Sequence, residues 1–210
     1  SKIIPGVKDS IIDGNKNNLK FIFITNNSSE TPNQIKHKLE NMLSCEVNLS
    51  DIVSPLVILK NYLNNLDSKI YVHGSSNLKE YVTTSSNELC SIDKSEIILI
   101  GRTESYSRYD VESIADAFNR GIDVFAMNKD LTFPINDVEF KDGNGAMVRE
   151  IENLIESNIN SFGKPDLFYS QYLLNQFPKI TAVIGDRVDT DVLLAKEINA
   201  KSYLVNSSIE

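Results

Sequence analysis

Cysteine is scarce in this sequence of 210 residues, and positive charge is outnumbered. The two cysteines, Cys45 and Cys90, are too few and too far apart to indicate a disulfide framework or a zinc site. We expect both to be ordinary buried or half-buried thiols. Lys and Arg number 21 against 29 for Asp and Glu, which gives a formal charge of −8. Binding to a phosphate backbone needs a clustered excess of Lys and Arg, so this composition argues against a nucleic-acid partner.

Long apolar runs are also absent. No run approaches the roughly 20 residues that a membrane-crossing helix needs, and the start, Ser1 to Ser10, lacks the basic-then-apolar layout of a secretory signal. We therefore predict no membrane partner and a cytoplasmic location. Hydrophobic residues make up 41% of the sequence and charged residues 24%. This balance is too apolar for a disordered chain and is typical of a soluble globular enzyme.

Short apolar segments alternate with helical patterns along the sequence. The predicted strands have the continuous apolar character of parallel strands covered on both faces; they are 21–24, 70–72, 97–100, 124–126, 181–184 and 203–205. Thr31-Pro32 and Ser54-Pro55 each pair an N-cap residue with proline at the first helical position, which predicts helices toward Met42 and over 56–66. Strands alternating with helices indicate an α/β fold with a mainly parallel sheet.

Further helices are predicted from apolar side chains that share one face. One such face holds Val111, Ile114, Ala115 and Phe118, in a helix that closes at Gly121. The other holds Met147, Ile151, Leu154 and Ile155. We also predict a helix with Pro165 as its first residue and another over 192–198. Gly143-Asn144-Gly145 lacks the third glycine of a dinucleotide fingerprint and is interpreted as a loop and helix start.

Two polar clusters could hold a phosphate, because open α/β sheets bind ligands where their strands end. Thr25-Asn26-Asn27-Ser28-Ser29 follows the first predicted strand and offers hydroxyl and turn N–H groups for phosphate oxygens. Its alternative interpretation is a polar turn and helix cap. Gly163-Lys164-Pro165-Asp166 places a lysine ahead of a predicted helix. That lysine either meets a phosphate or is a solvated surface residue.

A third cluster, residues 185–191 with the sequence Gly-Asp-Arg-Val-Asp-Thr-Asp, follows an apolar strand and gathers three carboxylates. Grouped oxygen ligands are what Mg²⁺ selects, and mutual repulsion makes such a group costly without a cation. The alternative is that Asp189 and Asp191 cap the following helix. An acidic protein that binds a small phosphate ester must supply positive charge locally, from a metal ion or a placed lysine.

In order and spacing, the three clusters resemble the motifs of the haloacid-dehalogenase-like phosphatases, in their nitrophenylphosphatase, phosphoglycolate-phosphatase and NagD-like branch. Residues 24–29 are close to the second motif of this branch, TNNS; 162–166 look like its third, GKP; and 183–191 resemble its fourth, GDRxDTD. Stretches 71–74 and 126–130 are similar in placement to parts of its inserted α/β domain, the cap.

The resemblance implies a Rossmann-like core with a mainly parallel sheet and an inserted α/β cap. We expect residues 1–66 to form the first part of the core, 67–158 the cap and 159–210 the second part of the core. The implied activity is Mg²⁺-dependent hydrolysis of small-metabolite phosphate monoesters, of the phosphoglycolate or nitrophenyl phosphate type, through an aspartyl-phosphate intermediate. A homodimer formed through the cap is also implied.

Site residues are carried over from the matching motif positions. Asp186 would bind Mg²⁺, with Asp191 supporting the ion's water shell or its neighbours. Thr25 and Lys164 would contact the phosphate as catalytic residues, because phosphoryl transfer depends on positioning and charge stabilisation. The expected phosphate-binding residues are Thr25, Asn26, Asn27, Lys164 and Arg187. His37 is interpreted as a surface residue, whereas His73 ends a predicted cap strand and could face substrate.

The nucleophile of the family stands in a first motif, Asp-x-Asp-Gly, upstream of the Pro-Gly that Pro5-Gly6 matches. The sequence begins at Ser1, so we expect the chain as given to lack the nucleophile and to show no turnover by itself. A non-catalytic phosphate- or metal-binding protein of the same family is therefore the alternative function.

Overall fold

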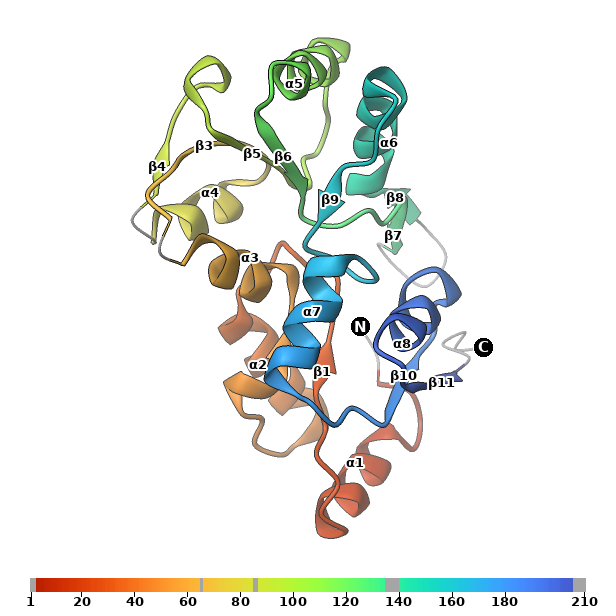
Figure 1. Cartoon of the computed structure of the whole chain (residues 1–210). Helices are drawn as coiled ribbons and strands as arrows, with labels where there is room; N and C mark the ends of the chain where they lie inside the picture. Colours follow the sequence, from red (N-terminus) through yellow and green to blue (C-terminus); the bar gives the residue numbers. More distant parts are fainter. Residues whose placement is uncertain (1–2, 65, 85–86, 135–139, 206–210) are drawn as a thin grey trace.

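The computed structural model describes residues 3–64, 66–84, 87–134 and 140–205. Helices and strands alternate along the chain, and the strands gather into several sheets (Figure 1). Among the described residues every strand pair is parallel except that of β7 (Thr132–Pro134) with β8 (Phe140–Asp142). The predicted α/β class with mainly parallel pairing is confirmed. No helix within the described ranges is long and apolar enough to cross a membrane.

The largest sheet has five parallel strands in the order β4-β3-β5-β6-β9. Their bounds are β3 Lys69–His73, β4 Glu88–Leu89, β5 Ile97–Ile100, β6 Asp123–Ala126 and β9 Asn160–Ser161. Within the described ranges it shares no strand with the sheet that carries Phe23. The sheet runs past residue 158, the expected end of the cap, because β9 pairs with β6. We call this sheet, together with α4, α5 and α6, the five-stranded layer (residues 69–161).

Helices cover both faces of this sheet, and its central strand β5 is apolar throughout. Alternate residues of β5 enter two different clusters: Leu99 packs with side chains of α3, α4 and α7, whereas Ile98 packs with α5 and α6. The covering helices are α3 Pro55–Leu63, α4 Ser76–Thr83, α5 Arg108–Asn119, α6 Asn144–Ile155 and α7 Leu167–Gln176. Every residue of β5 is 4% exposed or less, which explains its unbroken apolar run.

Two smaller parallel sheets have two strands each. In one, β1 (Phe23–Ile24) pairs with β2 (Ile52–Val53); in the other, β10 (Ala182–Gly185) pairs with β11 (Lys201–Leu204). Helix α1 (Val7–Lys16) and α2 (Pro32–Leu43) lie beside the first sheet (Figure 1), and α8 (Leu193–Glu197) returns the chain from β10 to β11. The predicted strand over 21–24 is thus reduced to its last two residues.

Local start and stop signals place most helices as predicted. Thr31 caps α2 by accepting a hydrogen bond from Gln34 N, and the Gln34 side chain accepts one from Thr31 N in return. Gly121 has a φ of 89°, a left-handed conformation that suits glycine after a helix. Ser54 holds the N-cap position of α3, but its hydroxyl makes no capping hydrogen bond.

Three helix predictions need correction. Helix α7 starts at Leu167 with Asp166 as N-cap, so Pro165 precedes the helix rather than opening it. Helix α3 ends at Leu63, short of the expected Leu66. Leu154 was expected on the buried face of α6 but is 43% exposed, because Met147, Val148 and Ile151 already fill the contact with the sheet.

Candidate active site

The loops after β1, β6 and β10 line one cavity of about 600 Å³. All seven predicted site residues lie on its wall: Thr25, Asn26, Asn27, Lys164, Asp186, Arg187 and Asp191. The structure therefore brings together motifs that are far apart in the sequence. Each of these loops follows the carboxyl end of a parallel strand, where α/β folds bind ligands. The three strands belong to separate sheets among the described residues, and their convergence follows from the apolar cluster that the sheets share. A second cavity of about 410 Å³, around residues 11–23 and 45–51, contains none of them.

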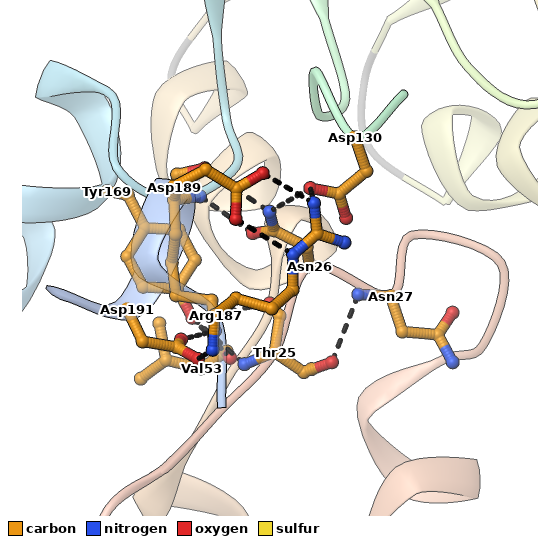
Figure 2. A network of polar contacts seen from close by, with 10 residues as sticks. Thr25, Asn26, Asn27, Val53, Asp130, Tyr169, Arg187, Asp189 and Asp191 are labelled. Carbon is orange, nitrogen blue, oxygen red and sulfur yellow. Dashed lines mark hydrogen bonds and ion pairs between the residues drawn. The ribbon is translucent and has the colours of Figure 1, made fainter. Parts of the chain in front are cut away.

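Thr25 stands at the end of β1 and is fixed through its backbone. Its N–H donates to Val53 O at 3.1 Å and lies 3.2 Å from the Tyr169 hydroxyl oxygen, and that hydroxyl in turn donates to Val53 O at 2.8 Å (Figure 2). Tyr169 is fully buried, and burial raises the pKa of its hydroxyl, so it stays protonated and able to donate. Thr25 Oγ1 accepts from Asn27 N at 3.1 Å, which leaves the hydroxyl hydrogen of Thr25 for a ligand.

Asn27 turns the chain away from β1. Its side chain accepts from Ser29 N at 2.9 Å and donates to Glu30 Oε2 at 3.1 Å. These contacts form a polar turn, which was the alternative interpretation of residues 25–29. The same turn lines the cavity. The two interpretations are therefore compatible: the turn aims the Thr25 hydroxyl while serving as a local turn.

Lys164 and Asp191 form a buried ion pair at the cavity. Lys164 Nζ donates to Asp191 Oδ1 at 2.6 Å, and the two side chains are 9% and 8% exposed. Asp191 Oδ2 also accepts from Arg187 N at 3.2 Å. A Cβ at Gly185 would lie 2.2 Å from Asp191 Oδ2, so the approach of this carboxylate needs glycine there. Lys164 is therefore not a solvated surface lysine.

The carboxylates of the third cluster do not cap a helix. They precede α8 in an irregular turn of π-helical type over Val188–Val192, and none makes a side-chain capping hydrogen bond. Asp189 instead pairs with Arg187, whose Nη2 lies 2.6 Å from Asp189 Oδ2. This hydrogen-bonded contact lowers the pKa of Asp189 and raises the pKa of Arg187. The capping alternative is therefore wrong for this cluster.

Asp186 is exposed and lies on the cavity wall, whereas Asp189, which is also exposed, is not among the residues that line the cavity. Among the described residues no group of three or more His, Cys, Asp or Glu side chains is arranged to hold a metal ion. The donor set still fits Mg²⁺, which is usually bound through one or two carboxylates while keeping several waters and contacting substrate phosphate. Asp186 offers such a carboxylate, whereas both oxygens of Asp191 are engaged within the protein.

Asn26 joins the loops around the cavity rather than presenting its side chain to it. Asn26 Oδ1 accepts from Lys164 N at 2.7 Å, and Nδ2 donates to Asp130 Oδ1 at 3.0 Å and to Lys164 O at 3.2 Å. Asn128 Nδ2 donates to Asn26 O at 2.9 Å. The Asn26 N–H has no partner within the described part of the chain. That N–H is the group that the prediction assigned to phosphate.

Sequence reasoning missed the roles of Asn128, Asp130 and Tyr169. The stretch 126–130 was matched to the cap by its placement, but nothing in its pattern says that two of its side chains reach a motif about a hundred residues away. Tyr169 looks like an ordinary apolar position of α7 in the sequence. Only its hydroxyl contacts reveal the link to β1.

Other singled-out residues lie elsewhere. His37 is exposed on α2 as predicted, with its side chain 76% accessible. His73 lies at the end of β3 with 10% of its side chain exposed, 3.9 Å from Asp110, and is not among the residues that line the cavity. Arg102, which follows β5, does line the cavity from the five-stranded layer.

The fold and site define an α/β protein with a cation-and-carboxylate site at the carboxyl ends of parallel strands. A family model described as haloacid dehalogenase-like hydrolase matches residues 1–86, and one described as HAD-hydrolase-like matches residues 161–210. The chain belongs to the haloacid dehalogenase-like hydrolases, in the branch of the nitrophenylphosphatases, phosphoglycolate phosphatases and NagD.

Individual relatives are distant in sequence and close in structure. Phosphoglycolate phosphatase 1A, chloroplastic, from Arabidopsis thaliana is 25% identical over 99% of this chain, and the match spans 65% of the relative's length. The fold matches p-nitrophenyl phosphatase from Archaeoglobus fulgidus with a TM-score of 0.86, at 23% identity over 98% of this chain and 80% of that one. NagD from E. coli K-12 matches with a TM-score of 0.81, at 20% identity over 100% and 83%.

Proposed function

We propose that the protein is a divalent-metal-dependent phosphatase that hydrolyses phosphate monoesters of small metabolites. The observation that carries the proposal is the convergence of all three motifs on one cavity, with Lys164 held by Asp191 and with Asp186 facing the same space. Named relatives that are phosphatases support this reaction class.

The phosphate would be held by groups at the end of β1 and by Lys164. The Thr25 hydroxyl and the Asn26 N–H can donate to phosphate oxygens, and the Lys164 ammonium keeps two further hydrogens beyond the one given to Asp191. Such an arrangement suits phosphoryl transfer, because this reaction is accelerated mainly by positioning and by compensation of negative charge.

Mg²⁺ is the metal we propose, with Asp186 as its protein ligand and Asp191 as a supporting carboxylate that also fixes Lys164. When bound, the ion would supply Lewis-acid polarisation of a phosphoryl oxygen and would offset the charge of the ester. Asp191 makes its contribution through the ion pair, which keeps the ammonium at the cavity wall instead of in solvent.

No described side chain on the cavity wall is available as the phosphoryl acceptor. Glu30 contacts Lys38 and Asn27, Asp130 contacts Asn26, and Asp191 is paired with Lys164. Asp186, the remaining carboxylate of the wall, is the proposed metal ligand. The β1–β2 and β10–β11 sheets each contain only two strands in the described residues. We propose that an aspartate on a further strand pairing with β1 and β10 accepts the phosphoryl group, as the family resemblance implies.

The five-stranded layer would act as the inserted cap and choose the alcohol part of the ester. Its contribution to the cavity wall includes Arg102, Asp130 and Asn144. A guanidinium at this wall favours esters whose alcohol part carries a second anionic group, such as phosphoglycolate, over aryl phosphates whose alcohol part is uncharged. We propose small anionic phosphate esters as the substrate class, with nitrophenyl phosphate as a generic test substrate.

The test compares three proteins for Mg²⁺-dependent hydrolysis of nitrophenyl phosphate and phosphoglycolate: the full-length gene product, its Asp186→Ala variant and the 210-residue chain alone. Turnover is expected only for the first. Mg²⁺ should also raise the melting temperature of the 210-residue chain, and Asp186→Ala should remove that increase. Binding of Mg²⁺ and inorganic phosphate by the full-length protein without any turnover would favour the non-catalytic alternative instead.

A further inference from the structure

Asp130 brings a charged side chain of the five-stranded layer into contact with two motif residues. Its Oδ1 accepts a hydrogen bond from Asn26 Nδ2 at 3.0 Å and lies 3.9 Å from Arg187 Nη2 (Figure 2). We propose that Asp130 is a positioning residue that sets the Asn26 amide, and through it the backbone of Lys164, in the geometry needed for phosphate. This inference rests on the proposed function and adds to it a task for the cap beyond substrate selection.

The backbone of Asp130 is itself held in place. Its N–H donates to Asn128 Oδ1 at 3.3 Å, and its carbonyl oxygen accepts from Gly145 N at 2.9 Å. A Cβ at Gly143 would lie 2.0 Å from Asp130 O, and one at Gly145 would lie 3.0 Å from its carbonyl carbon. The two glycines at the start of α6 therefore let the loop of Asp130 approach closely. By allowing this approach, the two glycines help to position the Asp130 carboxylate. The pattern Gly143-Asn144-Gly145 in the sequence did not indicate such a role.

The Asn26 side-chain amide has two orientations that differ by 180°, and its hydrogen-bond partners favour one of them. Asp130 Oδ1 can only accept a hydrogen bond from it, and the Lys164 N–H can only donate. Turning the amide by 180° would place its oxygen against the carboxylate and its NH₂ group against the N–H. Both contacts would become repulsive, so the carboxylate and the N–H reinforce a single orientation. The Lys164 carbonyl oxygen, which accepts from Asn26 Nδ2 at 3.2 Å, supports the same orientation from the side of Lys164. Loss of the carboxylate removes the one constraint that comes from the five-stranded layer.

Arg187 links the same carboxylate to the ion pair at the cavity. The guanidinium lies between Asp189 and Asp130, and the Arg187 N–H donates to Asp191 Oδ2. The side chains of Arg187 and Asp130 are 35% and 19% exposed, so their attraction is only partly screened by water. Asp130 thus contacts Asn26, which is bonded to the Lys164 backbone, and Arg187, which is bonded to the ion-pair partner of the Lys164 ammonium.

The decisive variants in the full-length protein are Asp130→Ala and Asp130→Asn. Asparagine keeps a side-chain oxygen that can accept from Asn26 but has no charge, so it separates the hydrogen bond from the attraction to Arg187. We expect Asp130→Ala to lower kcat about ten- to a hundredfold with KM changed much less, because a misaligned phosphate site harms the transition state most. Asp130→Asn should recover most of kcat.

Glu152 provides the matched control. It is a carboxylate of the same layer with a side chain 20% exposed, and it accepts from Lys129 Nζ and from Ile159 N, both at 2.8 Å. It does not line the cavity. Glu152→Ala should lower the melting temperature while leaving kcat unchanged. A loss of kcat in Glu152→Ala equal to that in Asp130→Ala would overturn the positioning role.

A readout without turnover keeps this inference separate from the proposed function. The side-chain NH₂ signal of Asn26, assigned by its loss in Asn26→Asp, can be followed by ¹⁵N NMR. Asp130→Ala should shift this signal and speed its hydrogen exchange, whereas Glu152→Ala should not. If the wild-type protein has no phosphatase activity, the proposed function fails while the amide signal still tests the coupling. An unchanged Asn26 signal in Asp130→Ala would refute the coupling itself.

Discussion

The five-stranded sheet and the β10–β11 sheet are both parallel and apolar in sequence, yet they differ sharply in burial. Every residue of β5 is 4% exposed or less, whereas Ile184, Tyr203 and Leu204 in the small sheet are 63%, 54% and 56% exposed. Helices cover both faces of the first sheet, whereas the second contacts the turn over Val188–Val192 and the short helix α8. The two regions therefore contribute unequally to stability.

Most of the proposed site residues lie outside the well-buried five-stranded sheet. Thr25 follows β1, and both Asp186 and Arg187 follow β10, so most of the proposed site residues follow strands of the two small sheets. Lys164 is the exception, because it follows β9 of the large sheet. The five-stranded layer shares one apolar cluster with the two small sheets. It is also joined to them by polar contacts, which include the Asn128 Nδ2–Asn26 O bond of 2.9 Å and the Asn26 Nδ2–Asp130 Oδ1 bond of 3.0 Å. A well-packed layer can hold an exposed site in place through such contacts, and breaking them individually tests this view.

The largest expected effect comes from Lys164→Met, which cuts the link between the chain after β9 and the turn after β10. It leaves the Asp191 carboxylate buried without a cation, so the free energy of unfolding should fall by about 3–5 kcal/mol. Urea unfolding measures this change. Lys16→Met removes an exposed pair whose side chains are 71% and 70% accessible and should cost less than about 1 kcal/mol. Equal losses in both variants would contradict the buried pair.

The difference in packing predicts a second contrast. Leu99→Ala opens a cavity in the centre of the five-stranded layer and should lower the free energy of unfolding by about 2–5 kcal/mol. Ile184→Ala in the small sheet removes a side chain that is already 63% exposed and should change it by no more than about 0.5 kcal/mol. Both values come from urea denaturation at one pH. A costly Ile184→Ala would show that β10 is packed more tightly than its exposure indicates.

Tyr169→Phe tests the contact between α7 and the sheet of β1 and β2. The hydroxyl hydrogen bond to Val53 O, with its neighbouring contacts to Thr25, is lost while the ring still fills its buried position. We expect the free energy of unfolding to fall by about 1–2 kcal/mol. Tyr172→Phe on the same helix, at a partly buried ring, is the control and should cost less.

The smallest effect should be a pH dependence that belongs to the five-stranded layer. Burial lowers the pKa of His73, and the nearby Asp110 only partly opposes this shift. Between the lowered pKa and the ordinary value of about 6.5, the unfolded chain binds more protons than the folded one. The free energy of unfolding should therefore fall as the pH drops below about 6.5, by at most about 1.4 kcal/mol per pH unit for this one group.

His73→Gln should flatten that part of the curve between pH 7.5 and 5.5. The carboxylates with lowered pKa values lose their stabilising effect only at lower pH, so they stay out of this window; they are Glu40, Asp93, Asp110 and Asp189. Urea unfolding of both proteins at the two pH values gives the comparison. A slope that is the same in both would show that His73 titrates alike in the folded and unfolded states.

Elements with local signals were predictable from the sequence. The start of α2 at Thr31-Pro32, the end of α5 at Gly121 and the apolar run of β5 each depend on a few neighbouring residues, and the structure confirms them. Predictions failed where a distant contact decides the outcome. The pairing of β9 with β6 extends the large sheet to Ser161, although two residues carry no strand signal of their own.

The candidate site divides in the same way. The sequence by itself determined which chemical groups are present in the three motifs, because side-chain chemistry and the motif spacing can be read directly along the chain. Only the tertiary structure decided which of these groups meet. Lys164 pairs with Asp191 instead of solvent, Asn26 holds Lys164 and Asp130, and neither choice has a local cause. Such contacts depend on where loops from separate strands end, and the packing of the whole fold sets those positions.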